Sequence, residues 1–299
     1  VLGLTRPVGR QDNFFELGGH SLQAVAVLSG IEKELDYAPP LRILFQAETL
    51  AELAAALDEA RGVPSAAVTG GGGVDLRAEA VLPDDVCVNL PAWQPGPLER
   101  VLLTGATGFL GAFLLNDLLQ HTTAAVYCLV RADSLSAGAE RIEQNLRKYE
   151  LWRPEYAERI LPRLGDLSAP RLGLDSDTFT TLAAEVDAIY HNGGAVNFLY
   201  AYDRLRDANV AGTIEVLRLA GTTRPTPVHF VSTLGVFMGD HYRGGRVTEA
   251  DLPSEPEGLP DGYNQSKWVA DALVRHAAER GLPVTIHRPA RATGHRRTG

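Results

Sequence analysis

The stretch Arg100–Gly111, which reads R-V-L-L-T-G-A-T-G-F-L-G, decides the fold of this chain. Three apolar residues at 101–103 predict a short buried strand, and the leucines and phenylalanine after the stretch recur at helical spacing. Between them, Gly105, Gly108 and Gly111 stand at G-x-x-G-x-x-G spacing. A strand, a glycine turn and a helix start form the unit that cradles a dinucleotide. The glycines let the backbone approach the pyrophosphate, and the helix N-terminus offers N–H groups and a partial positive charge.

We expect this turn to contact the cofactor through six residues: Gly105, Thr107, Gly108, Phe109, Leu110 and Gly111. The alternative is a glycine turn in an ordinary α/β domain. Partner motifs further along the chain decide between the two.

The composition narrows the class of protein. The chain has 299 residues, enough for two domains, and its formal net charge of −9 disfavours nucleic acid or an anionic membrane as a partner. No apolar run approaches the roughly 18 residues of a membrane span, and the first residues do not resemble a signal peptide. Two lone cysteines, Cys87 and Cys128, suggest a reducing, cytoplasmic location without a disulfide framework. The eight histidines lack metal-ligand spacing, so we predict no metal site.

The first 62 residues predict a small helical bundle. Apolar residues from Leu22 to Leu35 follow one face of a helix, and Thr49 is typical of an N-cap for a last helix. Before them, residues 12–22 read D-N-F-F-E-L-G-G-H-S-L, which leaves Ser21 after an open turn. Ser21 could be a plain N-cap, but a phosphate attached there would lie at the positive end of a helix.

This module resembles the peptidyl and acyl carrier domains of nonribosomal peptide synthetases and carboxylic acid reductases. The resemblance implies a 4′-phosphopantetheine arm on Ser21, added by a separate phosphopantetheinyl transferase. It also implies a four-helix bundle whose first helix is truncated here, and an adenylation domain upstream.

We divide the chain into a carrier domain at 1–62, a flexible linker and lead-in at 63–97, and a second domain at 98–299. The run T-G-G-G-G at 69–73 is flexible sequence. It suits a carrier that visits more than one active site, although it would also suit a plain spacer.

Strand ends in the second domain supply further cofactor candidates. A predicted strand at 124–130 ends at Arg131, and an arginine there accommodates a 2′-phosphate, which predicts NADPH with Arg141 as a second phosphate partner. Either arginine could instead be a solvated surface charge. The end of a third strand at 164–167 places Asp166 towards the adenine and Leu167 beside it.

A fourth strand at 186–190 leads into small residues that leave room for a cofactor, and we expect contacts from Asn192 and Gly193. Asn209 is expected to open the next helix and to brace it rather than touch ligand.

The candidate catalytic residues follow the fifth strand, at 228–232. Thr233 comes directly after it, and Tyr263 and Lys267 lie four residues apart in Y-N-Q-S-K, on one face of a helix. The lysine would lower the phenol pKa and hold a ribose hydroxyl, the tyrosine would donate a proton to an oxyanion, and the threonine would bind the same oxyanion. An ordinary surface pair is the alternative for Tyr263 and Lys267.

These motifs resemble the extended short-chain dehydrogenase/reductases, and more narrowly the thioester reductase domains of synthetases and carboxylic acid reductases. The resemblance implies a Rossmann-like, doubly wound parallel sheet, and a contact between Pro289 and the nicotinamide amide. The closing segment departs from the family pattern at Ala290 and Ala292. The family continues beyond Gly299 into a substrate-binding subdomain, so we expect this chain to lack much of its acyl pocket.

Together these features predict an α/β reductase preceded by an all-α carrier, which releases a carrier-bound acyl or peptidyl thioester as an aldehyde with NADPH. Three alternatives stay open: a redox-inactive cyclising domain, a dehydratase or epimerase acting on a nucleotide sugar, and a non-catalytic carrier and docking module with a vestigial nucleotide fold.

Overall fold

The computed structural model describes residues 8–10, 12, 14, 17, 21–35, 37, 39, 43–44, 47, 49–62, 74–198, 200–290 and 292, without the side chains of 21–25 and 59–62. The chain divides into two compact units, the first reaching Val74 and the second beginning at Asp75, with residues 198–201 grouped with the first. Among the described residues, no helix combines the length and the apolar character needed to cross a bilayer.

The first unit is helical, as predicted for the carrier. Its described helices are α1 (Ser21–Leu35) and α3 (Leu50–Gly62). They share a core that also takes two residues from the segment between them: Leu28, Ile43, Leu44, Leu53 and Leu57. The Thr49 hydroxyl accepts a hydrogen bond of 3.2 Å from the Glu52 amide, which confirms the predicted N-cap.

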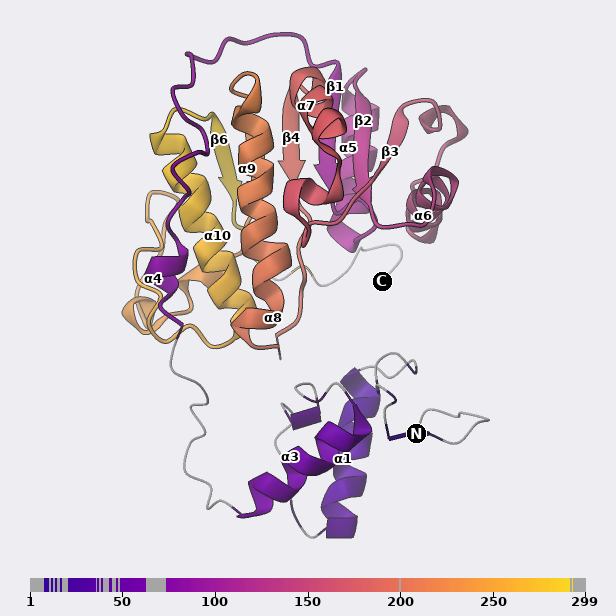
Figure 1. Cartoon of the computed structure of the whole chain (residues 1–299), viewed down its shortest axis with the longest axis vertical. Coiled ribbons are helices and arrows are strands. Elements are labelled where there is room, and N and C mark those ends of the chain that lie inside the picture. The colour runs from indigo at the N-terminus through magenta and orange to yellow at the C-terminus, as the bar shows by residue number, and fades with distance from the viewer. Residues whose placement is uncertain are drawn as a thin grey trace. The chain divides into compact units, whose positions relative to one another are not determined.

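The second unit is built on one six-stranded sheet in the order β3-β2-β1-β4-β5-β6, with every neighbouring pair parallel (Figure 1). The strands are β1 (Arg100–Thr104), β2 (Ala125–Val130), β3 (Ile160–Leu164), β4 (Ala188–His191), β5 (Val228–Val231) and β6 (Val284–His287). This is the doubly wound Rossmann arrangement that the sequence predicted. Chain order reverses between β1 and β4, and ligands of such sheets bind at the carboxyl ends of the strands at this switch point.

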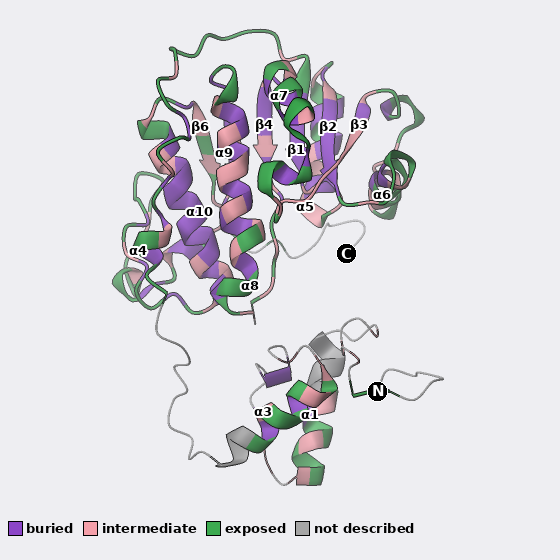
Figure 2. Cartoon of the chain, in the orientation of Figure 1, coloured by how far each residue is buried: buried purple, intermediate pink, exposed green. Residues whose placement is uncertain are grey.

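Helices cover both faces of the sheet (Figure 1). One face carries α5 (Phe109–His121) and α6 (Leu135–Lys148); the other carries α7 (Ser176–Glu185), α8 (Tyr202–Arg206), α9 (Gly212–Thr222) and α10 (Gly262–Glu279). Side chains alternate along each strand, so Val101 and Leu103 pack with α5 while Leu102 joins the core under α9 and α10. Figure 2 shows the result, with buried residues concentrated in the central strands and α10. Short helical turns complete the unit: η1 (Pro154–Tyr156), η2 (Pro170–Gly173), η3 (Asp207–Ala211), η4 (Leu234–Phe237) and η5 (Asp240–Tyr242).

Several features differ from the sequence-based expectation. The third strand ends at Leu164, because the Asp166 amide donates to the Leu172 carbonyl oxygen in η2 at 2.8 Å instead of continuing the ladder with β2. The strand β6 was not predicted. Nor was the four-residue helix α4 (Leu76–Glu79), which Asp75 caps and which Arg77 ties to Glu255 and Glu257.

Cys87 and Cys128 are both free and buried. Burial raises the pKa of the Cys87 thiol to about 11 and that of Cys128 to about 12. Neither thiol is suited to nucleophilic chemistry, because the thiolate form is suppressed.

Candidate active site

The glycine turn after β1 lies at the switch point of the sheet. Gly105 has φ +75°, and a Cβ atom there would lie 2.8 Å from the Cα of Gly193, in the loop after β4. A Cβ atom on Gly111 would lie 2.0 Å from the Gly105 carbonyl oxygen. Two of the three motif glycines are therefore required by the fold itself.

Gly108 is different, and it is the residue that fits a ligand. It is exposed, its φ of −91° suits any residue, and its Cβ atom would meet nothing nearer than the Gly105 oxygen at 3.4 Å. It is the N-cap of α5 and provides no side-chain hydrogen bond, which leaves N–H groups of the first turn for an anion. A glycine that packing does not need, at a helix N-terminus, fits the close approach of a pyrophosphate.

Asn145 on α6 holds the turn in place, a role that was not predicted from the sequence. Its side-chain amide donates to the carbonyl oxygens of Ala106 and Gly108, both at 2.9 Å. The available signal was an amide residue directly before Leu146, beside the buried face of the helix. Phe109 is fixed by edge contacts with the Phe113 and Tyr149 rings. Thr107 and Leu110 are half-buried in the same turn.

Arg131 and Asp166 come together beyond the ends of β2 and β3. Partial burial alone would raise the pKa of Asp166, but hydrogen bonds from Ser168 and the charge of Arg131 hold it below its ordinary value. The Arg131 side chain is exposed, and its carbonyl oxygen accepts a hydrogen bond from the Arg141 guanidinium, so both predicted phosphate partners lie on this edge. Leu167 follows, with its side chain 2.7 Å from a Cβ atom built on Gly193.

A buried hydrogen-bonded chain underlies the loop after β4. The Gly193 amide donates to Thr104 Oγ1 at 2.8 Å, and Thr104 lies 2.9 Å from His191 Nδ1. On the other side, His191 Nε2 lies 3.0 Å from Thr213 Oγ1, whose hydroxyl donates to the Asn209 carbonyl oxygen at 2.6 Å. Because the Thr213 proton is already used, Nε2 must carry the imidazole proton and Nδ1 must accept from Thr104. Burial and the nearby Lys267 charge lower the pKa of His191 to about 3, which keeps it neutral in this chain.

Asn192 and Asn209 have separate roles around this loop. Asn192 reaches the Gly105 carbonyl oxygen at 3.4 Å. Asn209 does not open a helix as predicted: it lies inside the π-helical turn η3, which joins α8 to α9 without a break. Its side chain bonds both backbone groups of Ala195 and donates to Ser266 Oγ at 2.9 Å, which confirms the predicted bracing role.

Thr233 follows β5, and its turn packs on α10. Its hydroxyl oxygen caps η4 by accepting from the Gly235 amide at 3.0 Å. A Cβ atom on Gly235 would lie 1.9 Å from Asn264 Oδ1, so the turn fits against the first turn of α10 only with glycine there. The fold thereby brings Thr233 beside the helix that carries Tyr263 and Lys267.

Lys267 is buried, with 5% of its surface exposed. Its Nζ donates to the Val231 carbonyl oxygen at 2.8 Å and lies 4.2 Å from the centre of the Phe230 ring. Burial lowers the pKa of Lys267 to about 8, against the opposing effect of the Asp271 carboxylate.

The pKa of Tyr263 lies above its ordinary value, because the phenol is partly buried and the Asp261 carboxylate is close. The lowering by Lys267 that we predicted is not observed. In this arrangement the ammonium is directed to the Val231 carbonyl oxygen.

Pro289 lies beside Thr233, as its carbonyl oxygen accepts a hydrogen bond of 3.0 Å from the Leu234 amide. Ala290 and Ala292 are exposed. Ser21 is the first residue of α1, and its side chain lies outside the described residues.

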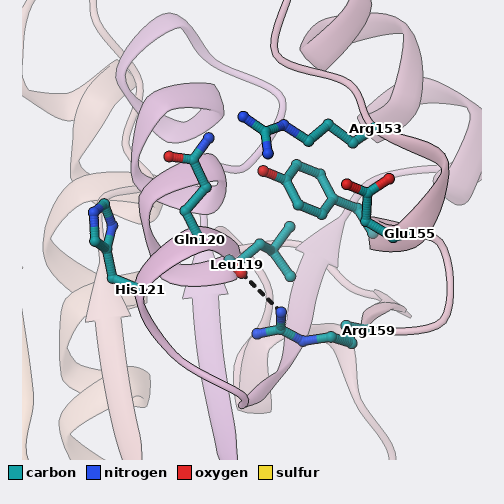
Figure 3. A pocket seen from close by; sticks show the side chains of 7 residues that line it. Leu119, Gln120, His121, Arg153, Glu155 and Arg159 are labelled. Carbon is teal, nitrogen blue, oxygen red and sulfur yellow. Dashed lines mark hydrogen bonds between the residues drawn. The ribbon is translucent and has the colours of Figure 1, made fainter.

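A surface pocket of about 540 Å³ lies at the opposite end of the strands, beside β2 and β3 (Figure 3). It is lined by Leu119, Gln120, His121, Arg153, Glu155, Tyr156 and Arg159. These residues precede β2 and β3, so the pocket is at the amino ends of the strands, away from the predicted site. The Arg159 guanidinium is already engaged by the Leu119, Thr122 and Ala124 carbonyl oxygens and caps α5.

The fold and the glycine turn define the second unit as a dinucleotide-binding domain of the short-chain dehydrogenase/reductase type. Residues 103–299 match the family described as Male sterility protein, and the chain belongs to that family. Residues 1–57 match the phosphopantetheine attachment site family. The chain is thus a carrier–reductase didomain of the nonribosomal peptide synthetase type.

Known proteins with similar sequences are large synthetases and reductases. One of the linear gramicidin synthase subunits of Brevibacillus parabrevis is 46% identical over 299 residues, 98% of this chain and 6% of that protein. Glycine betaine reductase ATRR of Emericella nidulans is 40% identical over 97% of this chain and 23% of that protein. The chain therefore spans a small part of these relatives.

Two solved structures are similar to this chain. The terminal R domain of the myxalamid PKS-NRPS pathway is 51% identical with a TM-score of 0.72, covering 75% of this chain and 57% of that one. A thiolation-reductase di-domain from an archaeal non-ribosomal peptide synthetase is 26% identical with a TM-score of 0.60, covering 97% of this chain and 60% of that one.

Proposed function

We propose that this chain reductively releases an acyl or peptidyl thioester from a 4′-phosphopantetheine arm on Ser21. The product is an aldehyde, with reduction to the alcohol as an optional second round. One observation carries the proposal: the Thr233 turn packs against the helix that bears Tyr263 and Lys267, and it follows β5, two strands along the sheet from β1 and its dinucleotide turn.

The proposed cofactor is NADPH. A dinucleotide bound across the β1–β4 switch point would place its pyrophosphate at Gly108 and one nucleoside over β2. Arg131 and Arg141 at the β2 edge would then bind the 2′-phosphate, with Asp166 towards the adenine. The other half of the dinucleotide would extend past Gly193 towards Thr233 and Pro289.

The residues around Thr233 have complementary roles in the proposed reaction. Bound NADPH would supply a hydride to the thioester carbonyl carbon. Thr233 would orient the carbonyl and donate a hydrogen bond to the oxyanion, and Tyr263 would give it a proton. The raised pKa of Tyr263 suits this role, because the phenol stays protonated at neutral pH. Lys267 would hold the ribose and return a proton to the tyrosine. Collapse of the hemithioacetal then yields the aldehyde and the free pantetheine thiol.

We further propose residues 1–62 as the carrier, 63–97 as linker and lead-in, and 98–299 as the reductase. The partners would be a phosphopantetheinyl transferase and an upstream adenylation domain. The free, buried Cys87 and Cys128 suit the reducing, cytoplasmic location that we propose.

The test is made on the complete natural protein. Ser21 is loaded from acyl-CoA by a promiscuous transferase, NADPH or NADH is added, and released aldehyde or alcohol is measured by mass spectrometry. Tyr263→Phe is compared with Tyr242→Phe, which removes a phenol that bonds the Leu252 carbonyl oxygen instead.

We expect release with NADPH that is lost in Tyr263→Phe and retained in Tyr242→Phe. A loaded protein that binds NADPH but releases nothing would overturn reductive release. Failure to load Ser21 would overturn the carrier assignment.

A further inference from the structure

A buried carboxylate on α10 lies where the segments of the candidate site meet. Asp271 is fully buried and follows Tyr263 and Lys267 at intervals of four residues, on the same face of the helix. Arg288, directly after β6, donates two hydrogen bonds to this carboxylate, from Nε to Oδ2 at 2.9 Å and from Nη2 to Oδ1 at 2.8 Å. Arg275 adds a longer contact of 3.3 Å from the partly exposed side.

The same carboxylate reaches the strand end that bears Thr233. The Ser232 hydroxyl donates to Asp271 Oδ2 at 2.7 Å. The backbone on either side of Thr233 is also paired with the segment that holds Arg288. The Ser232 amide donates to the His287 carbonyl oxygen at 2.7 Å, and the Leu234 amide donates to that of Pro289.

Stability alone does not explain this arrangement. The desolvation cost of burying an aspartate and an arginine offsets most of the electrostatic attraction between them. A buried ion pair is therefore a weak source of stability. The bidentate geometry of the Asp271–Arg288 pair, by contrast, fixes the distance and the angle between the elements that the pair joins.

We propose that Asp271 and Arg288 are positioning residues, whose buried pair holds Ser232, and through it the Thr233 turn, in one register against the part of α10 that carries Tyr263 and Lys267. Neither residue is assigned a contact with substrate. The expected effect on the rate of reduction rests on the proposed function. The expected effect on the bound nicotinamide requires only that this chain binds a dinucleotide.

The decisive variant is Ser232→Ala, because it removes the side-chain hydrogen bond between the strand end and Asp271 while leaving the Asp271–Arg288 pair and the backbone hydrogen bonds intact. Thr226→Val is its matched control: Thr226 is also buried, and its hydroxyl has no hydrogen-bond partner among the described residues. Arg288→Lys keeps the positive charge but loses the bidentate hydrogen bonding to Asp271. Asp271→Asn removes the negative charge.

Two measurements are made on the complete protein. The first is NADPH affinity together with the gain in nicotinamide fluorescence on binding, which needs no acyl substrate. The second is turnover with a loaded carrier, using NADPH with hydrogen or deuterium at the transferred position.

For Ser232→Ala we expect unchanged NADPH affinity, a smaller gain in nicotinamide fluorescence, a kcat reduced about tenfold or more, and a larger deuterium isotope effect. A loss of folded protein would lower the rate without changing the isotope effect. Arg288→Lys should show the same pattern, and Thr226→Val should match the wild type.

The inference is wrong if Ser232→Ala and Arg288→Lys match Thr226→Val in nicotinamide fluorescence. A wild-type protein that binds NADPH but releases no product would count against the proposed function, and the fluorescence comparison would still decide the positioning role.

Discussion

Gly111 packs so closely on Gly105 that a Cβ atom at residue 111 would lie 2.0 Å from the residue 105 carbonyl oxygen. The same oxygen is 3.4 Å from a Cβ atom built on Gly108. Within one motif, therefore, the fold requires glycine at one position, and the space at the other is left for a ligand.

This difference predicts opposite phenotypes for two alanine variants. Gly111→Ala should lower the free energy of unfolding by about 1–3 kcal/mol or more, because the methyl group meets backbone that cannot yield. Gly108→Ala should leave stability nearly unchanged but weaken NADPH binding by about tenfold or more, because the methyl group stands where the pyrophosphate approaches. Urea denaturation and fluorescence titration measure the two effects. Equal changes in stability would contradict this account of the turn.

Arg131→Ala should weaken binding of NADPH and leave binding of NADH nearly unchanged. A hydrogen bond to a charged group contributes about 1.5–3 kcal/mol, so the dissociation constant for NADPH should rise by about 10-fold to 150-fold. Calorimetry with both cofactors measures it. The control is Arg147→Ala, which removes an exposed arginine paired with Glu143 on α6. A similar loss of affinity for NADPH and for NADH would show that Arg131 does not bind the 2′-phosphate.

Lys267→Met should abolish reduction and yet stabilise the protein at neutral pH. Lowering the lysine pKa from 10.5 to about 8 corresponds to about 3 kcal/mol lost on burying the ammonium. The lost hydrogen bond to Val231 offsets only about 1 kcal/mol of that gain. Asp271 keeps its bonds to Arg288, so no charge is left unpaired. We expect the thermal midpoint at pH 7 to rise by several degrees.

The pH dependence of this stabilisation has a definite sign. Between pH 8 and 10.5 the unfolded chain keeps a proton on Lys267 that the folded chain has lost, so the wild type gains stability as the pH rises. The advantage of Lys267→Met should therefore shrink across this window. Unfolding midpoints measured from pH 7 to 10.5 check it, with exposed Lys148→Met as the control. A constant difference would mean that Lys267 is not buried as an ammonium.

His191→Gln should lower the free energy of unfolding at neutral pH. It should also reduce the loss of stability on acidification. At pH 7 the variant loses part of the hydrogen-bonded chain from Thr104 to Thr213, which costs about 1–3 kcal/mol. The wild type, with a His191 pKa of about 3 against 6.5 when unfolded, loses stability as the pH falls through that window, because only the unfolded chain takes up the proton. The difference between the two should therefore narrow towards pH 4. Denaturation curves at several pH values test this, and exposed His121→Gln controls for the loss of one histidine.

The local patterns of the sequence were enough for the main elements. The apolar run before Gly105, the glycine spacing and the helical recurrence after it predicted β1, the turn and α5. The four-residue interval between Tyr263 and Lys267 predicted a shared helix face, and the motif around Ser21 predicted the carrier module that residues 1–57 match. Each of these signals lies within about a dozen neighbouring residues, because strand and helix periodicity and turn chemistry are local properties of the backbone.

The tertiary structure alone decided what distant residues do together. It distinguished Gly108 from Gly111, directed the Lys267 ammonium to Val231 and set the direction of the hydrogen-bonded chain through His191. The short strand β6 and the helix α4 are held by contacts with partners far away in sequence, and they carry almost no periodic signal. Asp271 and Arg288 are 17 residues apart, and each alone resembles an ordinary surface charge. Their pairing depends on where the sheet places the end of β6 beside α10, and no local pattern encodes that placement.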